Sequence, residues 1–225
     1  MKTRCFIAGA GEYAGMIAPG QDDYIIAADG GYAKLDSLGI VPDLVVGDFD
    51  SLGTPPDHPH VIQSPVEKDD TDMMLAVKQG LERGLKTFII DGGLGGRLDQ
   101  TIANIQILAY LARNGARGIL LGREMCVTAV SNGRVLFAPE GAEPERTAPE
   151  WADPFSALSG NVSIFCMGDR AEGVTLTGLK YPLYNATLAC DYPLGVSNEF
   201  TGAPATVAVR DGTLIIAWTA MAVDS

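Results

Sequence analysis

The sequence predicts an α/β N-terminal domain with a mostly parallel, Rossmann-like sheet, followed by a small all-β sandwich or barrel domain. As far as about Phe137, short apolar runs alternate with stretches of helical periodicity, which is typical of a parallel sheet covered by helices. After that point only short β-rich runs remain, separated by Gly, Pro, Asn and Asp turns. We therefore expect a first domain at residues 1–138 and a second at 156–225, joined by a linker or long loop at 139–155.

In the first half, the helical stretches carry apolar residues three and four positions apart, and Gly84 and Gly115 follow two of them as plausible helix ends. The expected helices are Tyr32–Leu38, Thr71–Arg83 and Leu98–Asn114. The expected strands are Arg4–Ala8, Tyr24–Ala28, Leu44–Val46, Val61–Gln63, Thr87–Ile90 and Ile119–Leu121.

The second half begins with a polar, proline-bearing stretch without periodicity, which predicts the linker. No helical window of useful length follows it. The expected strands are Val162–Cys166, Val174–Leu176, Ala186–Ala189, Thr206–Val209 and Leu214–Ala217.

Composition narrows the classes of function. The 225 residues are 47% hydrophobic and 20% charged, with a formal net charge of −12. This hydrophobic content argues against a disordered chain, and the net negative charge argues against nucleic acid and anionic membranes as partners. No stretch reaches the ~20 apolar residues that cross a bilayer. We expect a soluble, cytoplasmic protein that binds small molecules.

Acidic side chains of the first half follow the expected strands instead of spreading over helix surfaces. Asp29 comes after the second strand, and Asp48 and Asp50 come after the third. Asp91 follows the fifth strand, and Lys68–Asp72 precedes a helix. Taken one at a time, each motif is at least as well explained by an ordinary turn or a helix cap.

Taken together, these acids predict a metal site. The carboxyl ends of parallel strands meet at one edge of a sheet, where acidic groups repel one another unless a cation neutralises them. Oxygen ligands without nearby His or Cys favour Mg²⁺, which bridges to substrate phosphates. Asp48 and Asp50 lie two residues apart, so in an extended segment both point toward the metal.

The glycine-rich run Gly92–Gly96 lies between an expected strand and an expected helix. Backbone N–H groups in such a run can approach an anion closely at the positive end of the helix dipole. Arg97 adds a guanidinium group that can hold phosphate oxygens. The run matches neither a P-loop nor a G-x-G-x-x-G fingerprint. The residues by themselves therefore predict a site for a nucleotide and Mg²⁺.

Four motifs of the first half resemble the signature blocks of the thiamine pyrophosphokinase family. They are Asp29-Gly-Gly, Gly47-Asp-Phe-Asp-Ser, Lys68-Asp-x-Thr-Asp and Gly95-Gly-Arg-x-Asp with Asn104 downstream. In the second half, Ala157-Leu-Ser-Gly, Val174–Leu183 and Gly195–Glu199 resemble the thiamine-binding domain of that family. The resemblance implies that the terminal diphosphate of ATP, the co-substrate, is transferred to the hydroxyl group of thiamine, giving thiamine diphosphate and AMP. It also implies a homodimer, in which each thiamine site lies between the nucleotide domain of one subunit and the β domain of the other.

Carried over by position, the resemblance implies a set of site residues. Mg²⁺ would be bound by Asp48, Asp50 and Asp72, and the catalytic residues would be Asp72, Arg97 and Asp99. ATP would be bound by Asp29, Gly30, Gly31, Lys68, Asp69, Thr71, Gly95 and Gly96, and thiamine by Asp99, Asn104, Ser197 and Asn198. Gln100 stands where many bacterial members have a His, so the chemistry does not require a His there.

In the implied reaction the primary hydroxyl of thiamine attacks the β-phosphorus of ATP in line, with AMP as the leaving group. Asp72 or Asp99 would accept the hydroxyl proton. Tyr181 or Trp218 could stack on the cationic vitamin, although the apolar strand around Trp218 favours a place in the core.

Two alternatives explain part of the pattern. The first is another Mg²⁺-dependent nucleotide transferase, such as a glycosyltransferase that uses Asp48 and Asp50 as an Asp-x-Asp motif. It leaves the remaining motifs without a role. The second is a catalytically inactive thiamine- or nucleotide-binding module, which the complete set of acidic residues argues against.

Overall fold

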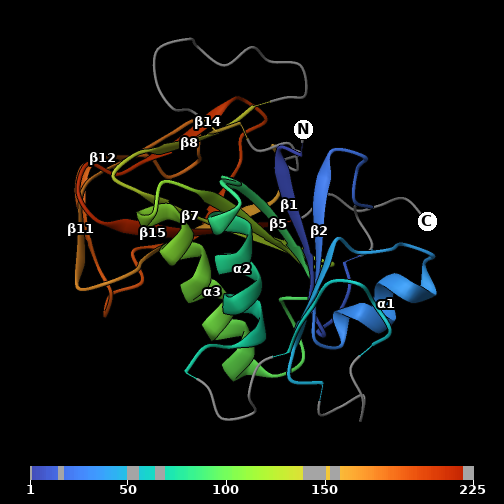
Figure 1. Ribbon diagram of the computed structural model, residues 1–225. Helices are drawn as coiled ribbons and strands as arrows, with labels where there is room; N and C mark the ends of the chain where they lie inside the picture. Colours follow the sequence, from blue (N-terminus) through green and yellow to red (C-terminus); the bar gives the residue numbers. More distant parts are fainter. Residues whose placement is uncertain are drawn as a thin grey trace. The chain divides into compact units, whose positions relative to one another are not determined.

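The computed structural model describes residues 2–14, 18–49, 56–63, 69–138, 151–152 and 158–219. The chain divides into two compact units, whose elements are labelled in Figure 1. Unit 1 comprises Met1–Ile107 and Gly115–Gly122. Unit 2 comprises Leu108–Asn114 and Arg123–Ser225.

Unit 1 contains a parallel sheet whose described strands follow the order β6-β5-β1-β2-β3-β4. In β1, Cys5 pairs with Tyr24 of β2 on one side and with Phe88 of β5 on the other. The central strands are buried on both faces, which explains why they are apolar throughout. The bounds are β1 (Arg4–Ala8), β2 (Asp23–Ala28), β3 (Leu44–Gly47), β4 (Val61–Gln63), β5 (Thr87–Asp91) and β6 (Arg117–Leu121).

Three helices connect these strands: α1 (Gly31–Ser37), α2 (Asp72–Glu82) and α3 (Leu98–Arg113). Helix α2 begins at Asp72 because the hydroxyl of Thr71 accepts a hydrogen bond from the backbone N–H of Met74 and caps the helix. Its buried face packs on the sheet at Gly80, where an added Cβ would lie 2.5 Å from the ring of Phe88. The glycine therefore allows the helix to approach the strands closely.

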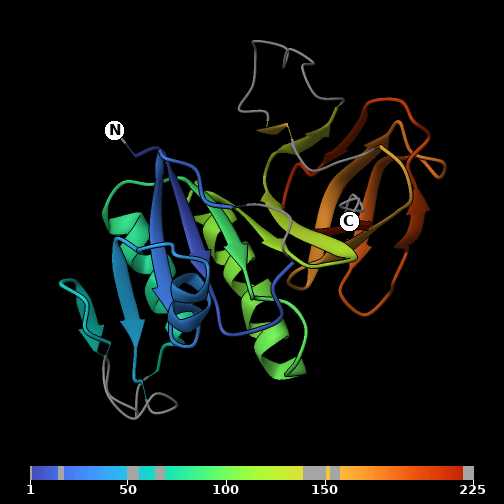
Figure 2. The same ribbon diagram turned by 90° about the vertical axis from the view of Figure 1, so that its right-hand side faces the viewer.

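Unit 2 is a β structure of two sheets, drawn in yellow-green to red in Figure 2. One sheet has the order β13-β10-β15-β7 and the other β12-β11-β14-β8-β9. All the described pairs are antiparallel except β8 with β9. The bounds are β7 (Met125–Ser131), β8 (Arg134–Phe137), β9 (Trp151–Ala152), β10 (Asn161–Cys166), β11 (Arg170–Thr177), β12 (Leu183–Ala189), β13 (Gly195–Glu199), β14 (Ala205–Ala208) and β15 (Thr213–Thr219).

Aromatic rings join the two sheets of unit 2. Trp218 of β15 is fully buried, and its ring centroid lies 5.5 Å from that of Phe137 on β8. The ring centroid of Phe200 lies 5.2 Å from that of Phe137. The expectation that Trp218 belongs to the core is confirmed.

The predicted fold class is confirmed: a mostly parallel α/β part and a small all-β part. Strands β7, β8 and β13 were not predicted. β7 and β8 precede residue 138 but pair with strands of unit 2. Of the predicted linker 139–155, only Trp151–Ala152 is described, and it forms β9. Among the described helices, none has the length and apolar character to cross a membrane.

Candidate active site

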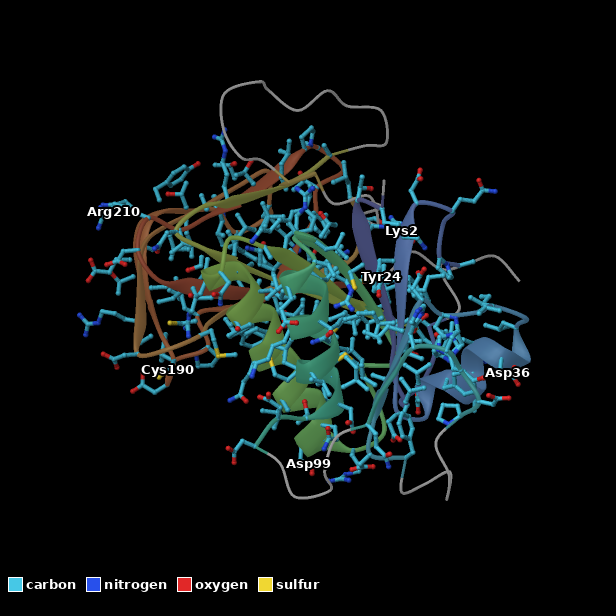
Figure 3. All side chains as sticks on the ribbon, viewed as in Figure 1. Lys2, Tyr24, Asp36, Asp99, Cys190 and Arg210 are labelled. Carbon is cyan, nitrogen blue, oxygen red and sulfur yellow. The ribbon has the colours of Figure 1, made fainter. Side chains whose placement is uncertain are left out.

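A cavity of about 450 Å³ opens at the carboxyl edge of the sheet of unit 1. The residues around it follow β1, β2, β3 and β5 or begin α2 and α3, so several strand ends share one space. Figure 3 shows Asp99 near this end of α3, whereas Lys2 and Tyr24 lie at the opposite end of the unit. The lining residues are Gly9, Ala10, Gly11, Ala28, Asp29, Asp48, Thr71, Asp72, Met73, Gly92, Gly93, Gly95, Gly96, Arg97, Gln100 and Asn104.

Three carboxylates from three different segments face this cavity, as the sequence predicts. Asp29 directly follows β2, Asp48 directly follows β3, and Asp72 is the first residue of α2. All three are half-buried. Arg97 is the one cationic side chain among the described residues that line the cavity. The cavity is therefore acidic, and a bound polyphosphate would need a further cation.

The backbone around Asp48 differs from the expectation of an extended segment. Strand β3 ends at Gly47, and Phe49 adopts a φ of 58° with its ring buried. A bulky residue in this left-handed region is uncommon and costs of the order of 1–3 kcal/mol. The buried ring of Phe49 thus anchors a turn that presents Asp48 at the sheet edge. The premise that residues 48 and 50 share one extended segment is wrong.

The structure describes two of the three predicted metal ligands. Asp48 and Asp72 face the same cavity, and Asp50 lies outside the described residues, as does Lys68. Within the described ranges, no group of three His, Cys, Asp or Glu side chains is close enough to hold a metal ion. The carboxylates that line the cavity, those of Asp29, Asp48 and Asp72, are oxygen donors of the type that Mg²⁺ prefers.

The polar side chains of the segment before α2 differ in role: some stabilise the helix and some line the cavity. Thr71 lines the cavity while its hydroxyl caps the helix. Asp70 forms an ion pair with Lys78 of α2, and the distance between Asp70 Oδ2 and Lys78 Nζ is 2.6 Å. Asp69 is exposed and does not line the cavity.

The glycine-rich loop supplies one wall of the cavity. Gly92, Gly95 and Gly96 have φ values of 74°, 81° and 64°, a conformation that favours glycine. Below them lies Asn104, which is 6% exposed and donates a hydrogen bond from Nδ2 to the carbonyl of Gly93 at 2.8 Å. The other end of this amide, Oδ1, is buried without a hydrogen-bond partner in the described structure. Because Asn104 lines the cavity, this oxygen is available to a donor group of a ligand.

Arg97 and Asp99 form a two-pronged ion pair at the exposed rim. The distances are 2.6 Å from Nη2 to Oδ2 and 3.2 Å from Nε to Oδ1. The hydrogen bond from Arg97 lowers the pKa of Asp99 below its ordinary value, with help from the backbone N–H of Gln100. Asp99 therefore remains ionised across the neutral range and binds a proton weakly.

Two predicted nucleotide ligands, Gly30 and Gly31, lie outside the cavity wall. Neither lines the cavity. Gly30 caps the start of α1, and Gly31 is buried where that helix meets the end of β1. An added Cβ at Gly31 would lie only 2.0 Å from the carbonyl oxygen of Ala8. In this structure the Asp-Gly-Gly motif therefore serves helix packing at its two glycines, and only its aspartate faces the cavity.

The fourth predicted acidic position, Asp91, does not join the other carboxylates. It is fully buried at the end of β5 and does not line the cavity. Its Oδ1 accepts hydrogen bonds from the backbone N–H groups of Ala14 and Gly92, each at 2.8 Å. Asp91 thus contributes an internal anchor, and the expectation that it converges on a shared cation is wrong.

The two predicted thiamine ligands of unit 2 lie on β13. Ser197 is exposed, but the amide of Asn198 is buried and accepts hydrogen bonds from the N–H groups of Tyr181 and Glu199. It also donates to the carbonyl of Tyr181 at 2.7 Å. Asn198 therefore holds the segment that carries Tyr181, whose ring is 56% exposed. Of the two aromatic residues considered for stacking, only Tyr181 presents its ring to solvent.

The predicted set of site residues leaves out part of the cavity wall. Gly9, Ala10 and Gly11 line it, as do Met73 and Gln100. The signal for the first three is the Gly-x-Gly spacing directly after a predicted strand, which is weak because it also fits an ordinary turn.

Comparisons with known proteins identify the family of the chain. The family description "Thiamin pyrophosphokinase, catalytic domain" matches residues 20–120, and "Thiamin pyrophosphokinase, vitamin B1 binding domain" matches residues 156–214. The chain belongs to the thiamine pyrophosphokinase family. It is therefore related to enzymes, and the predicted resemblance is confirmed.

Within the thiamine pyrophosphokinase family, the chain is 29% identical over 199 residues to the thiamine pyrophosphokinase of Bacillus subtilis, covering 85% of each chain. It is 26% identical over 189 residues to thiamin pyrophosphokinase 1 of Caenorhabditis elegans, covering 79% of this chain and 72% of that protein. The crystal structure of a thiamin pyrophosphokinase family protein from Enterococcus faecalis superposes with a TM-score of 0.75 at 26% identity, covering 99% of this chain and all of the other. The Bacillus subtilis crystal structure has the same fold, with a TM-score of 0.77 at 24% identity over 96% of this chain and 99% of that one.

Proposed function

We propose that this chain transfers the diphosphate of ATP to the hydroxyl group of thiamine, giving thiamine diphosphate and AMP. The observation that carries the proposal is the convergence of Asp29, Asp48 and Asp72 with a glycine-rich wall and Arg97 in one cavity of the catalytic-domain match. The names of the relatives support the choice of thiamine as the acceptor. The family assignment does not favour a glycosyltransferase or an inactive binding module.

The donor set of the cavity fits Mg²⁺ as the cofactor. Asp48 and Asp72 would hold the ion, with Asp29 beside them and Asp50 as a further predicted ligand. When bound, Mg²⁺ would neutralise phosphate charge and assist departure of AMP. The acidic cavity repels a triphosphate without such an ion, which is why we expect ATP to bind as its Mg²⁺ complex.

The residues of the chain contribute positioning and charge. The glycine wall allows the phosphate chain to approach main-chain N–H groups, which cost no reorganisation during the reaction. Arg97 would exchange its contact with Asp99 for phosphate oxygens, because both partners are more than half exposed. The buried Oδ1 of Asn104 would accept a hydrogen bond from an O–H or N–H group of a substrate.

We propose Asp72 as the acceptor of the thiamine hydroxyl proton. It lines the cavity, whereas Asp99 lies at the exposed rim and is not among the lining residues. A base acts in its ionised form, so kcat rises with pH through the pKa of that base.

The pH dependence of kcat tests this assignment. We expect Asp72→Asn to lower kcat by about 10²–10³-fold and to flatten the acid limb of the profile. Asp99→Asn is expected to keep the acid limb, even where kcat falls. An acid limb that survives in Asp72→Asn and disappears in Asp99→Asn would reverse the two roles.

We also propose that the active form is a homodimer. Unit 2 exposes Tyr184, Tyr192 and Leu194 by 73%, 67% and 48%, and a partner subunit would cover these apolar side chains. These residues lie on β12 and on the segment that leads into β13. Light scattering of the purified chain should give twice its mass of 23.7 kDa. A monomer that is fully active would contradict the proposal.

The reaction itself is tested by its products. The purified chain is incubated with ATP, Mg²⁺ and thiamine, and mass spectrometry should detect AMP and thiamine diphosphate in equal amounts. Release of ADP, or turnover of a UDP-sugar without thiamine diphosphate, would overturn the proposed reaction. Calorimetric binding of thiamine without any AMP would indicate an inactive binding module.

A further inference from the structure

Asp91 connects two loops that are far apart in the sequence. Its carboxylate oxygen Oδ1 accepts hydrogen bonds from the N–H of Ala14 and from the N–H of Gly92, both at 2.8 Å. Its main-chain oxygen accepts a hydrogen bond from the N–H of Gly9 at 2.7 Å. One residue at the end of β5 therefore holds both ends of the loop Gly9–Ala14, which follows β1.

The same loop is pressed against Gly92. The N–H of Gly11 donates to the carbonyl oxygen of Gly92 at 2.8 Å. A Cβ at Gly9 or Gly11 would lie 2.6 Å from that oxygen, and a Cβ at Gly92 would lie 2.5 Å from the oxygen of Gly9. The close approach leaves no room for side chains, so Gly9, Gly11 and Gly92 face the cavity with main chain alone.

A buried carboxylate in this position has an electrostatic cost. Asp91 is fully buried, and the nearby cavity already carries other acidic side chains. Its negative charge opposes a bound anion, so it does not favour ATP directly. Its two N–H donors compensate for burial of the charge.

Tyr13, which lies in the same loop, adds further contacts that hold the loop in place. Burial and the Asp91 carboxylate both raise the pKa of the Tyr13 hydroxyl. On α1, the ammonium group of Lys34 lies 5.2 Å from the centroid of the Tyr13 ring. The loop is thus held by an internal carboxylate and by a cation–π contact.

We propose that Asp91 is a positioning residue, which fixes the loop Gly9–Ala14 as a main-chain wall against which the phosphate chain of a nucleotide binds. The proposal rests on the proposed function for the identity of the nucleotide. Asp91 acts through the hydrogen-bond acceptor Oδ1 and touches neither substrate. Its charge is not required, because an asparagine presents the same acceptor to Ala14 and Gly92.

The test compares Asp91→Ala with Asp91→Asn. Calorimetry with Mg²⁺ and a non-hydrolysable ATP analogue should show about tenfold weaker binding for Asp91→Ala, which corresponds to about 1.4 kcal/mol. Asp91→Asn should bind within threefold of the unmodified chain. In the product assay, Asp91→Ala should raise KM for ATP by a similar factor, with kcat at saturating ATP changed less than threefold.

Asp23 provides a matched control. It is 2% exposed, lies at the start of β2, at the opposite edge of the sheet from Asp91, and accepts hydrogen bonds from the N–H of Gly20 and from Arg4. Asp23→Asn should lower the melting temperature while the affinity for the ATP analogue stays unchanged. The comparison distinguishes the general effect of removing a buried carboxylate from the specific effect of releasing the loop Gly9–Ala14.

The outcomes are decisive in either direction. Unchanged analogue binding by Asp91→Ala, or equal losses in Asp91→Ala and Asp91→Asn, would overturn the proposal. If Asp91→Ala does not fold, Gly11→Ala is the substitute variant, because its added Cβ displaces the same loop from Gly92. Gly11→Ala should weaken analogue binding tenfold. Unchanged analogue binding by Gly11→Ala would also overturn the proposal. Because analogue binding is measured without turnover, a chain that makes no thiamine diphosphate refutes the proposed reaction and leaves this test intact.

Discussion

Asp48→Ala is expected to reduce thiamine diphosphate formation by about 10³-fold, because it removes a proposed Mg²⁺ ligand from the acidic cavity. The folded structure should survive, since Asp48 is half-buried at a strand end among other carboxylates and its removal relieves repulsion. The melting temperature should change by no more than about 2 °C. The product assay and a thermal scan measure both effects.

Asp36→Ala is the matched control for this substitution. Asp36 is exposed on α1 and does not line the cavity, and Figure 3 shows it at the outer side of unit 1. Its removal should leave activity unchanged. If Asp48→Ala unfolds the chain while Asp36→Ala does not, the carboxylate of Asp48 has a structural role and the metal assignment loses its support.

Gly31→Ala is expected to have the largest effect on stability. The new Cβ would lie 2.0 Å from the carbonyl oxygen of Ala8 and 2.6 Å from its carbon, so either α1 or the end of β1 must move. Such overpacking against rigid backbone costs about 3 kcal/mol. For a chain of this size, the melting temperature should fall by about 6–12 °C. Urea denaturation followed by circular dichroism measures the change in the free energy of unfolding, and a thermal scan measures the change in melting temperature.

Gly20→Ala controls for the general effect of replacing a glycine. Its added Cβ would meet no atom closer than 3.7 Å, and its N–H would still donate to Asp23. The stability should change by less than about 0.5 kcal/mol. Equal losses in the two variants would show that the close contact with Ala8 is relieved without cost.

The central strands of unit 1 could be predicted because a parallel sheet buries both of their faces, and Arg4–Ala8 coincides with the predicted bounds. The edge strand Val61–Gln63 also coincides with its predicted bounds, although its residues are only partly buried or exposed. Strand β13 could not be predicted, since Gly195–Glu199 is rich in residues that rarely favour strands. Its pairing with β10 and the hydrogen bonds of Asn198 stabilise it instead. Tertiary contacts decide such elements, and a sequence pattern does not contain them.

The place of the candidate site could be predicted from the sequence, but the sequence does not tell which residues face the cavity. The carboxyl-edge rule for parallel sheets brings Asp29 and Asp48 together with the start of α2, whatever the details of the loops. The rule cannot distinguish a carboxylate that faces the cavity from one that is bonded to main chain. Asp91 ends its strand in the same way, yet its Oδ1 accepts hydrogen bonds from the N–H of Ala14, 77 residues away, and from the N–H of the adjacent Gly92. Likewise, glycines that bind phosphate and glycines that allow close packing have the same sequence signal.

The burial of Trp218 has a practical consequence for measuring these effects. The chain has two tryptophans, Trp151 and Trp218, and both belong to unit 2. Indole fluorescence excited at long wavelength therefore reports on the β structure alone, and unit 1 contributes no emission of this kind. A denaturation curve recorded by fluorescence that departs from one recorded by circular dichroism would reveal that the two units melt separately, with no need for an added label.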